Sequence, residues 1–190
     1  MKNIEDKILK DGRIIDNDIL KVDSFLNHQI DVAFLREFAL DVKEFFAGKK
    51  IDKVFTIETS GVAVAYAVAE QLGDVPLLFA KKSKSKIVDP NNIYLTRVKS
   101  FTRGAVAEVT VAKQYLRPGE NVLIVDDFLA EGNASIGLID LCQQANANVA
   151  GVAVVIEKVF QGGRKRLEEK GVPVFAGASI RAFQDNKPIF

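Results

Sequence analysis

Two adjacent carboxylates, Asp126 and Asp127, come directly after the apolar run NVLIV (121–125) and before a short loop that contains Gly132. The amides of such a loop, together with the first turn of a following helix, can hold a phosphate without any cationic side chain. The two carboxylates would repel phosphate, so they suit ribose hydroxyls, the waters of a magnesium ion or a developing positive charge. The alternative is a polar strand end that leads into a helix cap, and the spacing alone leaves both interpretations open.

Two further polar segments, ETSG (58–61) and KKSKSK (81–86), also follow short apolar runs. Thr59 and Ser60 offer hydroxyls and backbone amides, and Gly61 would let an anion approach the backbone closely. The same four residues could instead form a strand-to-helix turn with a serine cap. A run of lysines is usually a solvated face, but at a strand end it can neutralise an anionic ligand.

The apolar runs that precede these segments predict an α/β fold. Short buried strands alternate with amphipathic helices, which is typical of an open, mainly parallel twisted sheet with helices on both faces. In such sheets ligands bind beyond the carboxyl ends of the strands, where the polar segments lie. The predicted strands cover 53–57, 76–80, 121–125, 149–156 and 172–178, the predicted helices cover 3–10, 32–47, 61–72, 134–146 and 163–170, and a hairpin is expected from 93–101 and 105–112.

Length and composition exclude several classes of protein. The chain has 190 residues, 48% hydrophobic and 27% charged, which fits one compact domain and excludes a disordered or fibrous chain. With 26 Lys plus Arg against 25 Asp plus Glu, the net charge of +1 gives no overall field for nucleic acid or an anionic membrane. Cys142 and His28 are each alone, which excludes an intrachain disulfide and a zinc site of several histidines. No apolar run approaches the ~20 residues of a membrane span and no signal core is present, so we expect a cytoplasmic protein.

The string VLIVDDFLAEGNA (122–134) closely resembles the signature that binds phosphoribosyl diphosphate (PRPP) in type I phosphoribosyltransferases. Other segments resemble the bacterial purine-using members of that family whose acceptor is xanthine, and together they span residues 19–164. These segments are ILKVDSFLNHQID (19–31), TIETSG (56–61), FAKKSKS (79–85), KSFT (99–102) and VVIEKVFQGGR (154–164).

The resemblance implies a type I phosphoribosyltransferase-like fold with a hood, built as a single domain of residues 1–190. Residues 1–50 and 157–190 would contribute segments of the hood and of the purine site. Residues 84–104 would form a mobile loop that closes over the reaction to exclude water.

The resemblance also implies a role for each candidate residue. Asp126 and Asp127 would be the catalytic residues, beside the positive charge that develops on ribose. Lys158 would donate to the purine 6-oxo group, and Asn27, whose amide both donates and accepts, would read another edge of the ring. The protein would supply no metal ligand of its own, since Mg²⁺ would be bound mainly through PRPP and diphosphate. PRPP would contact Ala130, Glu131, Gly132, Asn133, Ala134, Thr59, Ser60, Lys81 and Lys82, and xanthine would contact Leu20, Asn27, Lys158 and Phe128.

The phosphate-binding segment departs from the family pattern at three positions. Many members carry Thr where Glu131 and Ala134 stand, so the phosphate here would depend more on backbone N–H groups. A carboxylate beside a phosphate dianion is unfavourable, so we expect the side chain of Glu131 to point to solvent. Some relatives carry an Asp general base where Ala130 stands. Because alanine cannot accept a proton, the purine would react already deprotonated or lose its proton elsewhere.

The expected function is therefore that of a glycosyltransferase of the pentosyl-transferring kind. It would move the 5-phosphoribosyl group of PRPP to N9 of xanthine, giving xanthosine 5′-monophosphate and diphosphate in purine salvage. The partners would be these small molecules and a second copy of the chain in a homodimer, with no nucleic acid and no membrane. Two alternatives stay open: adenine, hypoxanthine or guanine as the acceptor, and a regulator on the same fold that senses PRPP.

Overall fold

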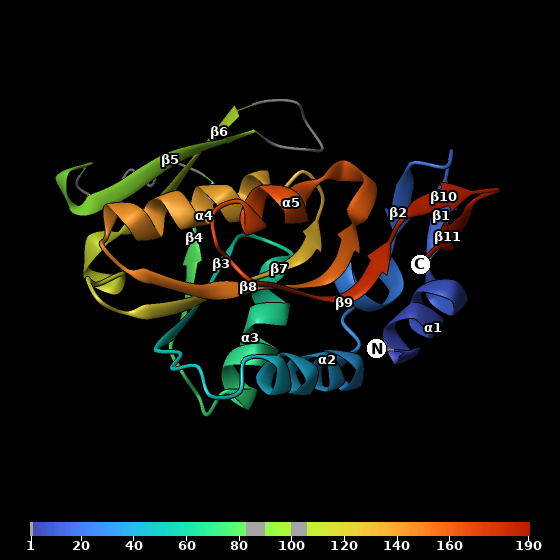
Figure 1. Cartoon of the computed structure of the whole chain (residues 1–190), viewed down its shortest axis with the longest axis horizontal. Coiled ribbons are helices and arrows are strands. Elements are labelled where there is room, and N and C mark those ends of the chain that lie inside the picture. The colour runs from blue at the N-terminus through green and yellow to red at the C-terminus, as the bar shows by residue number, and fades with distance from the viewer. Residues whose placement is uncertain (1, 83–89, 100–105) are drawn as a thin grey trace.

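A central parallel sheet of five strands organises the protein (Figure 1). The computed structural model describes residues 2–82, 90–99 and 106–190. The strand order is β4-β3-β7-β8-β9, and each neighbouring pair is parallel, which confirms the predicted α/β class. The strands are β3 (Lys53–Ile57), β4 (Leu77–Ala80), β7 (Asn121–Leu129), β8 (Asn148–Lys158) and β9 (Val174–Ile180).

Helices cover both faces of this sheet, as predicted. Side chains alternate along a strand, so β7 contributes Leu123 and Val125 to one core and Val122 and Ile124 to the other. The first core packs against α1, α2 and α3, and the second packs against α4 and α5. The helices are α1 (Lys2–Asp11), α2 (Val32–Phe45), α3 (Gly61–Gln71), α4 (Asn133–Gln144) and α5 (Gly163–Glu168). Within the described ranges, none of the helices combines the length and apolar character that crossing a membrane requires.

Two small hairpins from opposite ends of the chain lie side by side at one end of the molecule (Figure 1). Their turns hold two residues each with positive φ, a conformation that Asp and Asn tolerate better than other side chains. Asn17 and Asn186, one from each turn, exchange backbone-to-side-chain hydrogen bonds of 3.1 and 2.6 Å. This end corresponds to the segments predicted for the hood. The hairpins are β1 (Arg13–Ile15) with β2 (Ile19–Lys21), which a π-helix (Asp23–Asn27) follows, and β10 (Ala182–Gln184) with β11 (Lys187–Ile189).

A longer hairpin lies over α4, and its described strands confirm the pairing predicted between the segments at 93–101 and 105–112. Its strands are β5 (Ile93–Lys99), which follows a short 3-10 turn (Pro90–Asn92), and β6 (Val106–Ala112), which a second turn (Lys113–Tyr115) follows. Val98 and Val109 anchor it in the core beneath α4. Of the loop predicted at 84–104, residues 84–89 and 100–104 lie outside the described residues.

Candidate active site

The strand order reverses between β3 and β7, and the predicted site residues flank this point. From β3 the chain continues to β4 on one side, whereas from β7 it continues to β8 and β9 on the other. The loops that leave two such strands diverge, and the crevice between them is where ligands bind in open α/β sheets. Asp126 and Asp127 lie on β7, and the predicted diphosphate segment (58–60) leaves β3.

The two carboxylates lie within β7, although the sequence predicted that the strand would end at Val125. Asp126 pairs with Val154 of the long strand β8, and this neighbour extends β7 to Leu129. Because successive side chains alternate, Asp126 is buried at 7% exposure while Asp127 is half-buried. The backbone N–H of Asp127 donates to Asp126 Oδ1 at 3.0 Å. Burial, and secondly the charge of Asp127, raise the pKa of Asp126 well above its ordinary value.

Gly61, at the start of α3, packs directly against Asp126. A Cβ at this position would lie 2.7 Å from Asp126 Oδ1 and even closer to Thr56 Oγ1, so only glycine fits. The Thr56 hydroxyl is fully buried and has no hydrogen-bond partner in the part of the chain that the structure describes. The close approach that the structure shows at Gly61 is therefore that of the Asp126 carboxylate, and the predicted approach of a diphosphate stays a prediction.

The predicted diphosphate segment connects β3 to α3 and is hydrogen-bonded to the end of β4. Its Glu58 carboxylate accepts the backbone N–H of Lys82 at 2.6 Å, and its Glu58–Thr59 peptide bond is cis. Thr59 is exposed, and the half-buried Ser60 stands at the N-cap position of α3 but makes no side-chain cap hydrogen bond. The alternative of a strand-to-helix turn is therefore correct for the backbone, whereas capping by the serine hydroxyl is not observed. Lys81 and Lys82 are exposed beside this segment. The charge of Lys82 lowers the pKa of Asp126, against the larger effect of burial.

The predicted phosphate segment (130–134) runs from the end of β7 into α4. Gly132 precedes α4 with φ 78°, and no side chain caps the helix. The first amides of an uncapped helix have no intrahelical acceptor, so they can bind an anion. Glu131 is exposed, as predicted, but its carboxylate also accepts the side-chain amide of Asn133 at 2.9 Å. One of the two amide hydrogens of Asn133 is therefore already used.

Residues predicted to contact the purine lie on β8, on the small N-terminal hairpin and on the π-helix that follows it. β8 extends two residues beyond the predicted end at 156, so Lys158 lies inside the strand at 6% exposure. Its Nζ donates to the Asp18 carbonyl at 3.0 Å and lies 5.4 Å from the ring centroid of Phe183. Burial lowers the pKa of Lys158. Leu20 is buried in the hairpin that contains Asp18, whereas Asn27 is exposed at the last residue of the π-helix.

Sequence reasoning missed several residues around these segments. Phe183 lies near Lys158 and edge-on to Phe160, with ring centroids 5.5 Å apart, and Phe128 packs against the same core as Phe183. Gly163 donates its N–H to the Ala130 carbonyl at 3.0 Å, and a Cβ on it would collide with that oxygen. The sequence signal for this close approach is the glycine pair in FQGGR (160–164).

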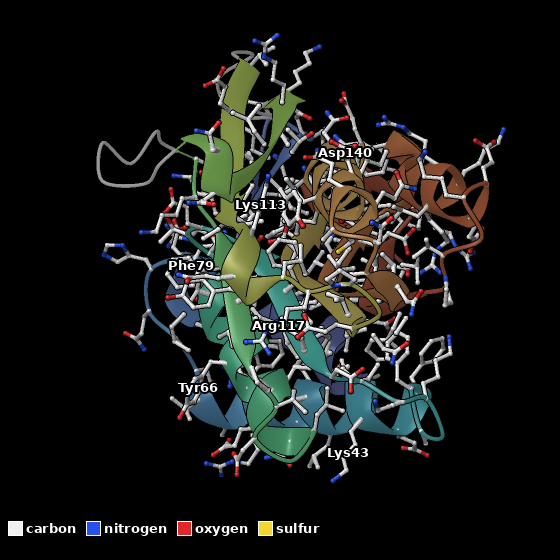
Figure 2. All side chains as sticks on the ribbon, turned by 90° about the vertical axis from the view of Figure 1, so that its left-hand side faces the viewer. Lys43, Tyr66, Phe79, Lys113, Arg117 and Asp140 are labelled. Carbon is white, nitrogen blue, oxygen red and sulfur yellow. The ribbon has the colours of Figure 1, made fainter. Side chains whose placement is uncertain are left out.

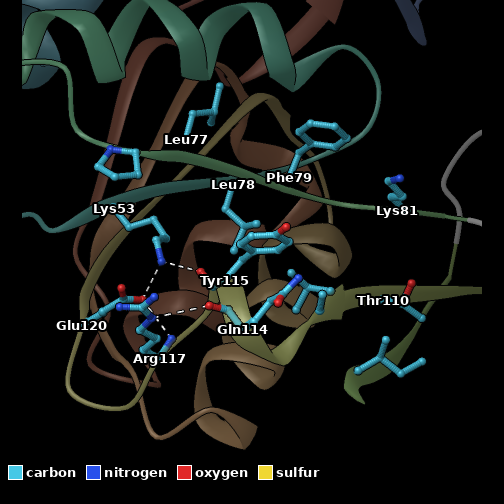
Figure 3. Close-up of a pocket in the computed structure, with 14 residues that line it drawn as sticks. Lys53, Leu77, Leu78, Phe79, Lys81, Thr110, Gln114, Tyr115, Arg117 and Glu120 are labelled. Carbon is cyan, nitrogen blue, oxygen red and sulfur yellow. Dashed lines mark hydrogen bonds and ion pairs between the residues drawn. The ribbon is translucent and has the colours of Figure 1, made fainter. Parts of the chain in front are cut away.

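A cavity of about 580 Å³ lies away from this crevice, on the outer edge of β4 (Figure 3). Only Lys81 of the predicted site residues lines it. The Lys53 ammonium, 2.7 Å from Glu120, also donates to the Tyr115 carbonyl at one end of the cavity. Its lining is otherwise mainly apolar, with Leu77, Leu78 and Phe79 from β4. Because the carboxylates and the anion-binding amides lie elsewhere, we place the candidate site at the crevice.

A parallel sheet with paired carboxylates between two segments that could bind anions is the arrangement expected for the class of phosphoribosyl-transferring enzymes. Residues 21–176 match the family described as "Phosphoribosyl transferase domain", and the chain belongs to this family. The predicted family is thus confirmed.

Relatives that match along the whole chain carry names more specific than that of the family. The xanthine phosphoribosyltransferase of Clostridioides difficile is 54% identical over 97% of each chain, and xanthine phosphoribosyltransferase 1 of Clostridium perfringens is 47% identical over 100% of each. Among solved structures, the adenine phosphoribosyltransferase from Rhodothermus marinus superposes with a TM-score of 0.76. That structure is 24% identical and covers 95% of this chain and 100% of its own, which confirms the fold.

Proposed function

We propose that the chain transfers the 5-phosphoribosyl group of PRPP to N9 of xanthine, giving xanthosine 5′-monophosphate and diphosphate. The observation that carries the transfer is the convergence of the Asp126–Asp127 pair with two anion-binding segments at one switch point. The similarity to enzymes named for xanthine, extending along the whole chain, supports the acceptor.

PRPP would lie across the crevice with its two charged ends on different strand ends. The amides from Gly132 to Ala134, at the start of α4, would hold the 5′-phosphate. Thr59, Ser60 and the ammonium groups of Lys81 and Lys82 would hold the diphosphate. With its two ends held in this way, ribose would lie against β7, which carries the two carboxylates.

In the reaction the lone pair of N9 forms a bond to ribose C1 while the bond from C1 to the diphosphate oxygen breaks. The bonding electrons leave with diphosphate, so positive charge develops on the ribose ring. Asp126 and Asp127 stabilise that charge, and the lysines neutralise the leaving group. Ala130 cannot accept the purine proton, so xanthine enters deprotonated or loses its proton to solvent or to another group.

Magnesium fits this site as a companion of the substrate. Among the described residues no group of three His, Cys, Asp or Glu side chains could hold a metal ion. Mg²⁺ commonly keeps several waters and binds through one or two carboxylates together with substrate phosphates. The half-buried Asp127 carboxylate is suited to accept from such waters. When bound, the ion would supply further neutralisation of the diphosphate.

Xanthine would lie between β8 and the hairpin end, with Lys158 donating to its 6-oxo group. The ammonium is a donor only, so it matches an oxo acceptor and leaves a 6-amino group without a partner. Phe128 and Leu20, which pack in the same core, would contact the ring, and Asn27 would read another polar edge.

The homodimer, which the resemblance implies, and the cytoplasmic location, which is expected because the sequence shows no membrane span and no signal core, remain predictions. For the dimer, the support is an apolar edge: Phe79 and Tyr66 are exposed on the side of the molecule that faces the viewer in Figure 2, and the exposed Tyr115 lines the cavity beside β4. Sedimentation of the purified chain would decide it.

The decisive test is diphosphate release from PRPP with a panel of xanthine, guanine, hypoxanthine and adenine. We expect the highest kcat/KM with xanthine. A preference for adenine would contradict the acceptor, and binding of PRPP with no release for any base would favour the regulator.

A further inference from the structure

Arg166, on the short helix α5, is hydrogen-bonded to the phosphate segment. Nη1 of Arg166 donates to the backbone carbonyl of Glu131 and to Asn133 Oδ1, the latter at 2.9 Å. Asn133 Nδ2 in turn donates to Glu131 Oε2 at 2.9 Å. Arg166, Glu131 and Asn133 thus form a closed set of hydrogen bonds, which we name the loop clamp.

The bond to the Glu131 carbonyl determines the direction of a neighbouring donor. In a planar trans peptide the C=O of one residue and the N–H of the next point in opposite directions. Because the Glu131 carbonyl points toward the guanidinium of Arg166, the N–H of Gly132 points away from that guanidinium. Arg166 therefore selects the peptide orientation in which this N–H can serve the anion.

The bond to Asn133 removes a competitor of the anion. An asparagine at a helix start readily accepts backbone N–H groups of the first turn with its side-chain oxygen. Here that oxygen accepts from Arg166 instead, and no side chain caps α4. The amides of the first turn consequently keep their capacity for a phosphate.

The helix that carries Arg166 is itself firmly anchored. Its Arg164 is paired with Glu157, which is 1% exposed, through contacts of 2.7 to 3.0 Å. Its Leu167 is fully buried, and the N–H of Gly163 donates to the Ala130 carbonyl at 3.0 Å. Arg166 is thus presented to the phosphate segment from a rigid base.

The loop clamp also accounts for the unusual carboxylate in this segment. Glu131 beside a phosphate dianion would be unfavourable by itself. The guanidinium of Arg166, bonded to the Glu131 backbone and to the Asn133 amide that Glu131 holds, offsets that charge locally. Where many relatives would use a threonine hydroxyl, this chain uses a carboxylate, an amide and a guanidinium to orient backbone donors.

We propose that Arg166 is a positioning residue for the 5′-phosphate of PRPP, acting through Glu131 and Asn133 without touching the reacting atoms. This inference rests on the proposed function, because it assigns the 130–134 segment to that phosphate. It predicts a defect in PRPP affinity, with turnover at saturating PRPP and affinity for xanthine preserved.

The test compares Arg166→Ala with Lys165→Ala, which removes the same charge from the adjacent exposed position of α5. We expect Arg166→Ala to raise KM for PRPP by about tenfold, since it removes two bonds from a charged donor on an exposed surface. We expect kcat and KM for xanthine to stay within about twofold, and Lys165→Ala to change all three values by less than about twofold. Arg166→Lys, which keeps the charge but not the planar fork, should fall between parent and Arg166→Ala.

An equal rise of KM in both alanine variants would overturn the proposal, because it would report long-range charge alone. A fall in kcat with KM for PRPP unchanged would also overturn it. Calorimetric titration with ribose 5-phosphate makes the test independent of catalysis. If the parent transfers nothing to xanthine, the proposed function fails. Weaker binding of ribose 5-phosphate by Arg166→Ala, but not by Lys165→Ala, would still support the loop clamp. Unchanged binding by Arg166→Ala would refute the loop clamp.

Discussion

Replacement of Lys158 by methionine would test how the protein chooses its purine. Methionine keeps nearly the length of lysine and removes the charge at a position that is 6% exposed. A hydrogen bond from a charged donor is worth about 1.5–3 kcal/mol, and about 1.4 kcal/mol corresponds to a tenfold change. We therefore expect Lys158→Met to lower kcat/KM for xanthine by roughly tenfold to a hundredfold. KM for PRPP should stay nearly unchanged, because the phosphate segment leaves β7 and not β8.

The same substitution has a small structural cost that must be measured beside the kinetics. The Lys158 ammonium donates to the carbonyl of Asp18, a residue on the exposed surface, so water can replace this donor. We expect a change of less than about 1 kcal/mol in the free energy of unfolding, measured by thermal denaturation. A variant that unfolds much earlier would have lost the hairpin packing, and its kinetics would then not report purine recognition.

A pH series on the parent provides an independent check. Burial lowers the pKa of Lys158 from its ordinary 10.5, and lysine donates as a cation only below its pKa. KM for xanthine in the parent should therefore rise at a pH below 10.5, and Lys158→Met should lack this rise. The reasoning is refuted if Lys158→Met weakens PRPP and spares xanthine. Lys158 would then belong to the diphosphate site, and purine choice would rest on Leu20 and Asn27.

Three further outcomes are expected. The double change of Asp126 and Asp127 to Asn, nearly isosteric, should leave a folded protein with a large loss in kcat; a rate within about threefold of the parent would contradict their role. Because Ala130 cannot act as a base, the acidic limb of the pH–rate profile should shift with the acidity of the purine when xanthine is compared with a less acidic oxopurine. One limb shared by both substrates would instead report Asp126. Thr56→Val removes a buried hydroxyl that lacks a hydrogen-bond partner among the described residues, so it should stabilise the fold by about 1–3 kcal/mol. The melting temperature should rise by about 2–4 °C for each kcal/mol. An unchanged or lower melting temperature would show that the hydroxyl does have a hydrogen-bond partner.

Local patterns in the sequence predicted most of the sheet. The strand at 53–57 has the predicted bounds, and the hairpin of β5 and β6 pairs as expected. These elements are short apolar runs bounded by polar or glycine residues, so their identity depends on nearby residues alone. The rule that ligands bind beyond the strand ends also predicts, from the sequence alone, that the Asp pair and the phosphate segment lie at one edge of the sheet.

The same patterns misplaced the ends of three strands, since β9 ends at Ile180 and not at 178, and β7 and β8 also run further than predicted. β7 includes Asp126 and Asp127, and β8 includes Lys158, because each strand continues as long as a neighbour can pair with it. A polar residue in a central strand looks like a strand end when the partner is unknown. Pairing of this kind depends on the register between strands, and a single strand does not encode it.

The sequence by itself determined the fold class and the residue types proposed to face PRPP, because βαβ order and a long signature are local in the chain. Only the tertiary structure decided which residues support them. The contact of Lys158 with Asp18 joins positions 140 apart, and the contact of Arg166 with Asn133 joins positions 33 apart. The sequence separation of neither pair matches the period of a helix or a strand, so no pattern in the sequence predicts these contacts. Such contacts arise when packed strands and helices bring distant side chains within hydrogen-bond reach, so they follow from the assembled fold and not from any one segment.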